Sequence, residues 1–131
     1  MSHPLLLDRI AASVSELHAD ALLLSRAMAS GSRSAVDTLI GDLGALIVSI
    51  NTQRGPDQDA LVALRHTATA LTHLVHAAEH LASEDTTAHD GTAALHQVQS
   101  AVRCLHVAHS DLLRAGSRRL GPAARILGAA A

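Results

Sequence analysis

Apolar residues recur along this chain at alternating spacings of three and four, the period of helices that pack against other helices. The clearest case lies between Pro4 and Ser30, where the apolar positions are Leu7, Ile10, Val14, Leu17, Ala21, Leu24 and Met28. A proline is tolerated in the first turn of a helix, so Pro4 suits the start of this segment. The pattern predicts one helix over the whole segment.

Three further segments follow the same period. The second, from Ser34, has Val36, Ile40, Leu43, Ile47 and Ile50 on its seam, the line of a and d positions that faces the core. The third, from Asp57 to Ser83, has Leu61, Leu64, Ala68, Leu71, Val75, Ala78 and Ala82. The fourth, which runs to about Ala115, turns Leu95, Val98, Val102, Leu105 and Leu112 inward.

Short polar stretches at 51–59 and 83–91 separate these segments and predict turns. Four helices joined by short loops indicate an all-α fold, an antiparallel up-down-up-down four-helix bundle over residues 1–116. Gly116 is expected to end the fourth helix. A C-terminal tail, residues 117–131, then follows, with a short helix expected from Pro122.

The second segment carries more apolar surface than one core needs. Leu39, Leu46 and Val48 leave its seam, and Gly41 and Ala45 would let a neighbouring helix approach closely. We interpret this excess as a second buried surface, most simply that of a symmetric homodimer. The alternative is that this helix is the most central one of the bundle.

Composition narrows the class of protein. The chain has no aromatic residue and no lysine, and its formal net charge is −2, so neither base stacking nor a basic surface favours nucleic acid. A single cysteine, Cys104, and an N-terminus without a signal-peptide pattern fit the cytoplasm. The sequence contains no run of about 18 apolar residues, so we expect no membrane span. The bias toward Arg, Ala and Gly suggests a high-GC bacterium.

Ten histidines are the remaining peculiarity, and four of them stand in "RHTATALTHLVHAAEH", residues 65–80. With Leu61 at heptad position a, His66, His73 and His80 fall at f and His76 at b, one stripe facing away from the core. Imidazole clusters suit Zn, Cu or Ni. The best candidate ligand set adds His96 of the fourth helix, which is expected to lie level with His80. The set is then His73, His76, His80 and His96.

Three other interpretations of the stripe stay open. "RHTATALT" resembles, over a few residues, the motif of histidine phosphotransfer domains, which implies His66 as the phosphoryl acceptor. Thr69 and Ala70 stand where that family has lysine and glycine. Protonation of neighbouring histidines would also make the stripe sensitive to pH, because full protonation changes the formal net charge from −2 to +8. The fourth interpretation is an ordinary solvated helix face.

No nucleophile–base pair, phosphate-binding loop or HExxH pattern is visible, so we predict a protein without enzymatic activity. Cys104 is expected to act as a small buried hydrophobe. The leading functional hypothesis is a homo-oligomeric interaction or regulatory module with a protein partner, without nucleic acid or membrane. Binding of a divalent transition metal by the histidine stripe is the alternative, and a histidine phosphotransfer-like module is the third.

Overall fold

The computed structural model describes the backbone of residues 4–26, 33–81 and 88–130, and the side chains of 6–26, 33–81 and 90–117. These residues form four helices and no strand: α1 Pro4–Arg26, α2 Arg33–Gln53, α3 Gln58–Leu81 and α4 Ala88–Ala130. The predicted all-α fold is therefore confirmed.

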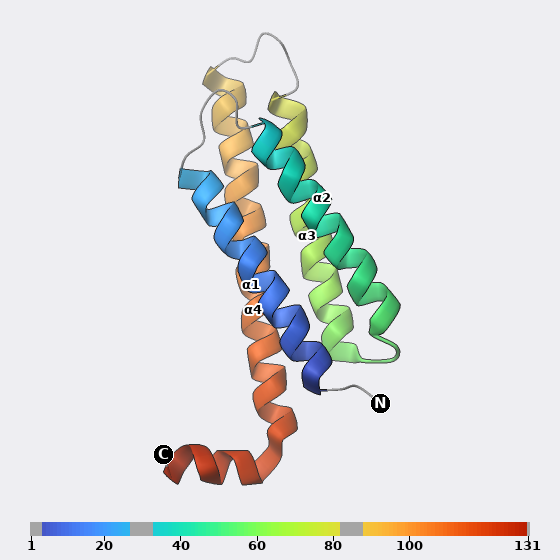
Figure 1. Ribbon diagram of the computed structural model, residues 1–131. Coiled ribbons are helices and arrows are strands. Elements are labelled where there is room, and N and C mark those ends of the chain that lie inside the picture. The colour runs from blue at the N-terminus through green and yellow to red at the C-terminus, as the bar shows by residue number, and fades with distance from the viewer. Residues whose placement is uncertain (1–3, 27–32, 82–87, 131) are drawn as a thin grey trace.

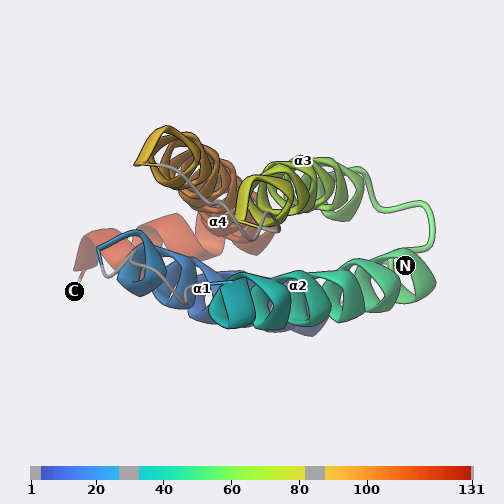
Figure 2. The same cartoon turned by 90° about the horizontal axis from the view of Figure 1, so that it is seen from above.

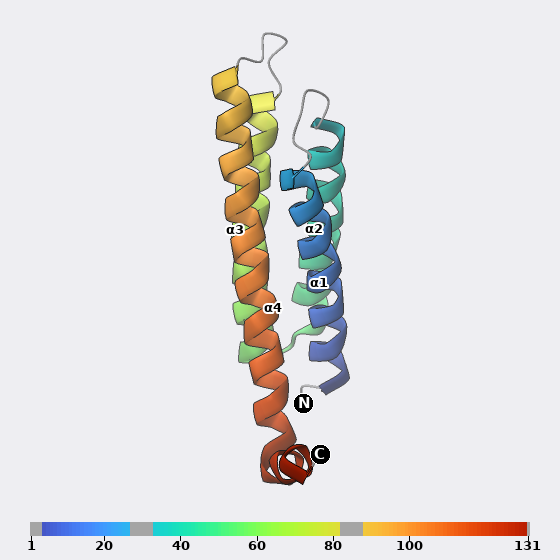
Figure 3. The same cartoon turned by 90° about the vertical axis from the view of Figure 1, so that its left-hand side faces the viewer.

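The helices alternate in direction and form an antiparallel bundle (Figure 1). Each helix packs against the next one along the chain, and α4 closes the bundle by packing against α1. Seen end on, α1 and α2 make one layer and α3 and α4 the other (Figures 2 and 3). The α3–α4 pair has the most extensive packing of all, whereas the α1–α2 pair has the least among neighbours.

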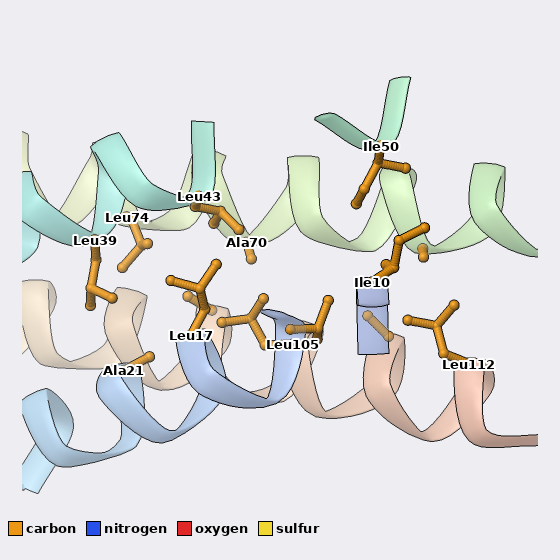
Figure 4. Packing of buried hydrophobic residues seen from close by; sticks show 14 of the residues in the cluster. Ile10, Leu17, Ala21, Leu39, Leu43, Ile50, Ala70, Leu74, Leu105 and Leu112 are labelled. Atoms are coloured by element: carbon orange, nitrogen blue, oxygen red, sulfur yellow. The ribbon is translucent and has the colours of Figure 1, made fainter. Parts of the chain in front are cut away.

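The seam of α1 agrees with its sequence pattern. Its buried residues are Leu7, Ile10, Ala11, Val14, Leu17, Ala21 and Leu24, which include every predicted position except Met28, a residue outside the described part of the chain. On α2 the buried residues are Val36, Leu39, Leu43 and Ile50. These large aliphatic side chains meet those of the opposite layer in the middle of the bundle (Figure 4).

The seam of α3 lies one residue earlier than the sequence pattern predicts. Its buried residues are Ala60, Ala63, Thr67, Ala70, Leu74 and Ala77. The predicted positions from Leu61 to Ala78 are half-buried or exposed. Hydrophobicity alone favours the frame with more leucine. However, alanine at the contact lets two helices approach closely, while Leu64 and Leu71 still pack against the core from one side.

The partner helix α4 has the matching arrangement. Ala94, Ala101, Ala108 and Ala115 are buried at intervals of one heptad, alternating with Val98, Leu105 and Leu112. Of the positions expected inward, Val98, Leu105 and Leu112 are confirmed, whereas Leu95 and Val102 are only half-buried. Small residues thus line both sides of the α3–α4 contact.

The turn between α2 and α3 is shorter than the predicted loop at 51–59, because both helices extend into it. Gly55 has a φ of +52°, a left-handed conformation that glycine adopts without strain. Asp57 then begins α3 as its N-cap: its Oδ1 accepts hydrogen bonds from the backbone N–H groups of Asp59 (2.9 Å) and Ala60 (3.1 Å).

The prediction that the fourth helix ends at Gly116 is wrong, since α4 continues to Ala130. A glycine inside a helix costs only about 1 kcal/mol relative to alanine, which the surrounding turns offset. The last part of α4 bends away from the bundle axis (Figure 1). Pro122 lies in this part, and a proline inside a helix removes a backbone hydrogen bond and kinks it.

Candidate functional sites

Three of the stripe histidines lie at the α3–α4 interface instead of facing outward. With the seam shifted by one residue, His66, His73 and His80 fall at heptad position g, beside the core, and all three are half-buried. We call these three residues the histidine row. The expectation of an outward stripe was wrong because the predicted heptad frame was one residue out of register.

Each member of the histidine row meets a polar side chain of α4. His66 Nε2 lies 3.5 Å from Asp111 Oδ2, and His80 Nδ1 lies 3.8 Å from Asp90 Oδ1. Between them, His73 Nδ1 forms a 2.8 Å hydrogen bond with Gln97 Oε1. Because an amide oxygen only accepts, this bond places a proton on His73 Nδ1. The row therefore joins α3 to α4 through side chains on the flank of the seam.

The four predicted metal ligands are not gathered around one point. His76 is exposed on α3 with Nδ1 3.4 Å from Glu79 Oε2, and His96 is exposed on α4. His80 lies opposite Asp90, about 9 Å along α4 from His96 at the helical rise per residue. Within the described part of the chain, no three His, Cys, Asp or Glu side chains are placed to share a metal ion. A site for Zn, Cu or Ni here stays a prediction that needs groups from beyond one copy.

The geometry at His66 favours a contact with a carboxylate over a role as phosphoryl acceptor. Its side chain is 34% exposed, and Nε2 faces the carboxylate of Asp111, which also pairs with Arg114 at 2.9 Å. A phosphoryl group approaching Nε2 would meet that negative charge. The resemblance to the phosphotransfer motif therefore gains no support from the surroundings of His66.

The sequence pattern missed a second group of histidines, at the α1–α4 edge. His18 of α1 faces His106 of α4, with ring centroids 5.7 Å apart and ring planes inclined by 42°. His109 lies one turn further along α4 and acts electrostatically on His18. We call His18, His106 and His109 the α1–α4 histidine cluster. Burial, followed by the charges of His106 and His109, lowers the pKa of His18.

Cys104 belongs to the α4 surface that faces α3. It follows Asp90 and Gln97 and precedes Asp111 at heptad spacing, and it packs half-buried against the core. Burial raises the pKa of its thiol, against a smaller opposing effect of Arg103. The thiol is therefore protonated at neutral pH, which disfavours nucleophilic chemistry.

The outward side of α2 is built mostly from small residues, and Asp37, Asp42 and Ser49 are also exposed on this helix. Five exposed positions recur at helical spacing, and we call them the α2 outer face: Thr38, Gly41, Ala45, Val48 and Thr52. Val48 is 66% exposed. A β-carbon added at Gly41 or Gly44 would meet no atom within 4 Å, so the chain itself leaves this face uncovered.

Among the described residues, α2 is also the helix whose length and composition would suffice to cross a membrane. Core helices of bundles pass the same test when they are mostly buried, but only 22% of the apolar window of α2 is buried. A small groove of about 400 Å³ adjoins this helix on its α1 side. The groove is lined by Leu6, Ile10, Leu46 and Ile50 among others, with Arg9 and Gln53 at its polar part.

Comparisons with protein-family models, with curated proteins and with solved structures give no match for this chain.

Proposed function

We propose that this protein is a homo-oligomeric interaction module that self-associates through the α2 outer face. The observation that carries the proposal is the exposure of Val48 and of the small residues beside it on α2, the most apolar helix of the bundle. An apolar helix face that its own fold leaves uncovered is typical of a surface that another molecule covers. A second copy of the chain is the simplest such molecule.

The glycines of α2 support close contact with a neighbouring helix. Gly41 and Gly44 have helical backbone conformations, and a β-carbon added at either position would meet no atom from other parts of the chain within 4 Å, so the fold of one copy does not require glycine there. Each costs about 1 kcal/mol of helix stability relative to alanine. Small side chains at a helix crossing allow the two backbones to approach, which offsets this cost in a dimer.

The charges flanking the face suit an antiparallel pair of α2 helices related by a two-fold axis. Asp37 lies near the start of α2, and Arg54 follows its end. If the helices cross near Gly44 and Ala45, Asp37 of one copy comes close to Arg54 of the other, twice by symmetry. Such pairing fixes orientation more than it adds affinity.

The test is the mass of the protein in solution across micromolar to submillimolar concentrations, measured by sedimentation velocity. The wild type is expected to dimerise, and Val48→Asp to abolish dimerisation by placing a carboxylate in the apolar contact. Val75→Asp is the matched control, because Val75 is an exposed valine of α3 on another side of the bundle. It is expected to dimerise like the wild type.

A wild type that stays monomeric over the whole range would refute the proposal, as would equal effects of the two substitutions. Phosphatidylcholine vesicles test whether a lipid bilayer, instead of a second copy, covers this helix face. If the protein floats with vesicles while it remains monomeric in their absence, the face binds a bilayer and the dimer is wrong. Circular dichroism confirms that each variant is folded.

A further inference from the structure

The two edges of α4 carry histidines in opposite electrostatic surroundings. On the α3 side, His66 lies beside the carboxylate of Asp111. On the α1 side, the α1–α4 histidine cluster brings imidazoles together from two helices, with the His18 and His106 rings 5.7 Å apart. Helix α4 packs against both α1 and α3, so protonation of histidines acts on both edges at once.

The charged groups around the α1–α4 histidine cluster do not neutralise it. Within the described residues, no carboxylate lies within ion-pair distance of any of its three imidazoles, whereas His66, His76 and His80 each have one at that distance. On α4, Arg103 lies one turn before His106 and adds to the positive potential, whereas Asp111, two residues after His109, faces His66 of α3. On α1, Glu16 and Asp20 flank His18 in sequence but are exposed.

The other two helices offer the cluster no counter-charge either. The groove residues place α2 on the Arg9 and Ser13 side of α1, whereas His18 lies on the side that meets α4. Asp42, the acidic residue of α2 nearest in level, is therefore on the far flank of α1 and is exposed. Helix α3 is diagonal to α1, and its His66 faces Asp111 on the α3 side of α4.

We propose that the α1–α4 histidine cluster makes the bundle open at one edge on acidification: protonated His18, His106 and His109 repel one another and separate α1 from α4, while α3 and α4 stay together. The α3–α4 edge stays closed because protonation of His66 converts its contact with Asp111 into an ion pair. Opening exposes apolar side chains of the α1–α2 layer that are buried at neutral pH.

The pKa of His18 gives the direction of the pH dependence. It lies below 6.5 in the folded chain, so the unfolded or opened chain binds the proton more readily. The stabilising contribution of neutral His18 is complete above pH 6.5 and is lost as the pH falls below that value toward the pKa in the folded chain.

Hydrogen–deuterium exchange of the full chain tests the proposal, with rates corrected for the intrinsic effect of pH. Between about pH 8 and about pH 5.5, protection of α1 amides relative to α3 amides is expected to fall at least about twofold, the scale of like-charge pairs on helices. His18→Gln, which cannot be protonated, is expected to remove this loss. His66→Gln is the matched control, because His66 lies beside a carboxylate whereas His18 lies beside other imidazoles. This variant is expected to leave α1 as acid-sensitive as in the wild type.

Two results would overturn the proposal: α1 protection that is independent of pH in the wild type, or the same loss in His18→Gln. If His18→Gln does not fold, the double variant His106→Gln/His109→Gln replaces it, since neither side chain is fully buried. Histidine ring NMR gives a second readout, because that double variant is expected to raise the titration midpoint of His18. An unchanged midpoint counts against the cluster. Exchange is measured at a concentration where the sedimenting mass is equal at both pH values, so the outcome is independent of the proposed dimer.

Discussion

Replacing Gly41 and Gly44 by alanine is expected to have opposite effects on the single bundle and on its association. Both glycines lie inside α2, and both have helical backbone conformations. An added β-carbon meets no atom within 4 Å at either position, so the substitution introduces no clash within one copy. The only internal effect is the gain in helix propensity.

That gain is about 1 kcal/mol for each glycine, or about 2 kcal/mol for the double variant. For a chain of 131 residues, a change of 1 kcal/mol shifts the midpoint of thermal unfolding by roughly 3 to 5 °C. The midpoint of Gly41→Ala/Gly44→Ala should therefore rise by about 6 to 10 °C at concentrations where the protein is monomeric. In the dimer, the two extra methyl groups of each copy hold the α2 helices apart and weaken association.

Circular dichroism at 222 nm follows the melting, since the chain has no aromatic residue to report by fluorescence. The melt is recorded at a low and at a high protein concentration, and sedimentation velocity is run in parallel. A midpoint that does not rise at low concentration would refute the view that nothing in the chain requires these glycines. A higher midpoint with unchanged dimerisation would remove them from the proposed interface.

Two further predictions concern the fold that positions these surfaces. Asp57→Ala should lower the free energy of unfolding by about 1 to 2 kcal/mol through loss of the N-cap of α3, as measured by urea titration. Asp57→Asn keeps the Oδ1 acceptor and loses only the charge at the helix start, so it should cost less, about 0.3 to 1 kcal/mol. Equal losses in the two variants would assign the effect to charge instead of hydrogen bonding. Leu105→Ala should cost about 2 to 5 kcal/mol, because the side chain is 1% exposed and its removal leaves a cavity. Leu113→Ala on the same helix, with 57% exposure, should change stability by less than about 0.5 kcal/mol, and a comparable loss there would contradict the assignment of the core.

The difference between α1 and α3 shows what a hydrophobic pattern can predict. On α1 the seam holds Leu7, Val14 and Leu17, and the adjoining frame holds polar residues such as Asp8, Ser15 and His18. Only one rotation of that helix buries apolar side chains, so the pattern determines it. On α3 two adjacent frames are both apolar, and the frame with leucine is the more hydrophobic. The frame with alanine is the one buried, because the close approach of α4 requires side chains that are small as well as apolar.

The candidate sites depended on that rotation. One residue of error in the frame placed His66, His73 and His80 on the outside instead of at the α3–α4 interface. Their contacts with Asp111, Gln97 and Asp90 of α4 were therefore not predicted. The contact between His18 and His106 could not be predicted from the hydrophobic pattern, for another reason. It joins helices far apart in sequence, and it requires the rotation of both to be known. Of the apolar residues that leave the predicted seam of α2, Leu39 is buried in the core of its own bundle and Leu46 packs against that core, so the excess seen in the sequence reduces to the exposed Val48.

The repeated alanines along α3 and α4 raise a question of alignment between the two helices. A contact surface that repeats every seven residues accepts a neighbour that has slid by one heptad almost as well as one in place. The histidine row distinguishes these alignments, because its partners on α4 are not alike. A slide that moves Gln97 opposite His80 would bring the thiol of Cys104 opposite His73, which then loses its amide partner. The His73–Gln97 hydrogen bond and the His80–Asp90 contact thus favour the present alignment of two helices whose apolar faces alone would permit several.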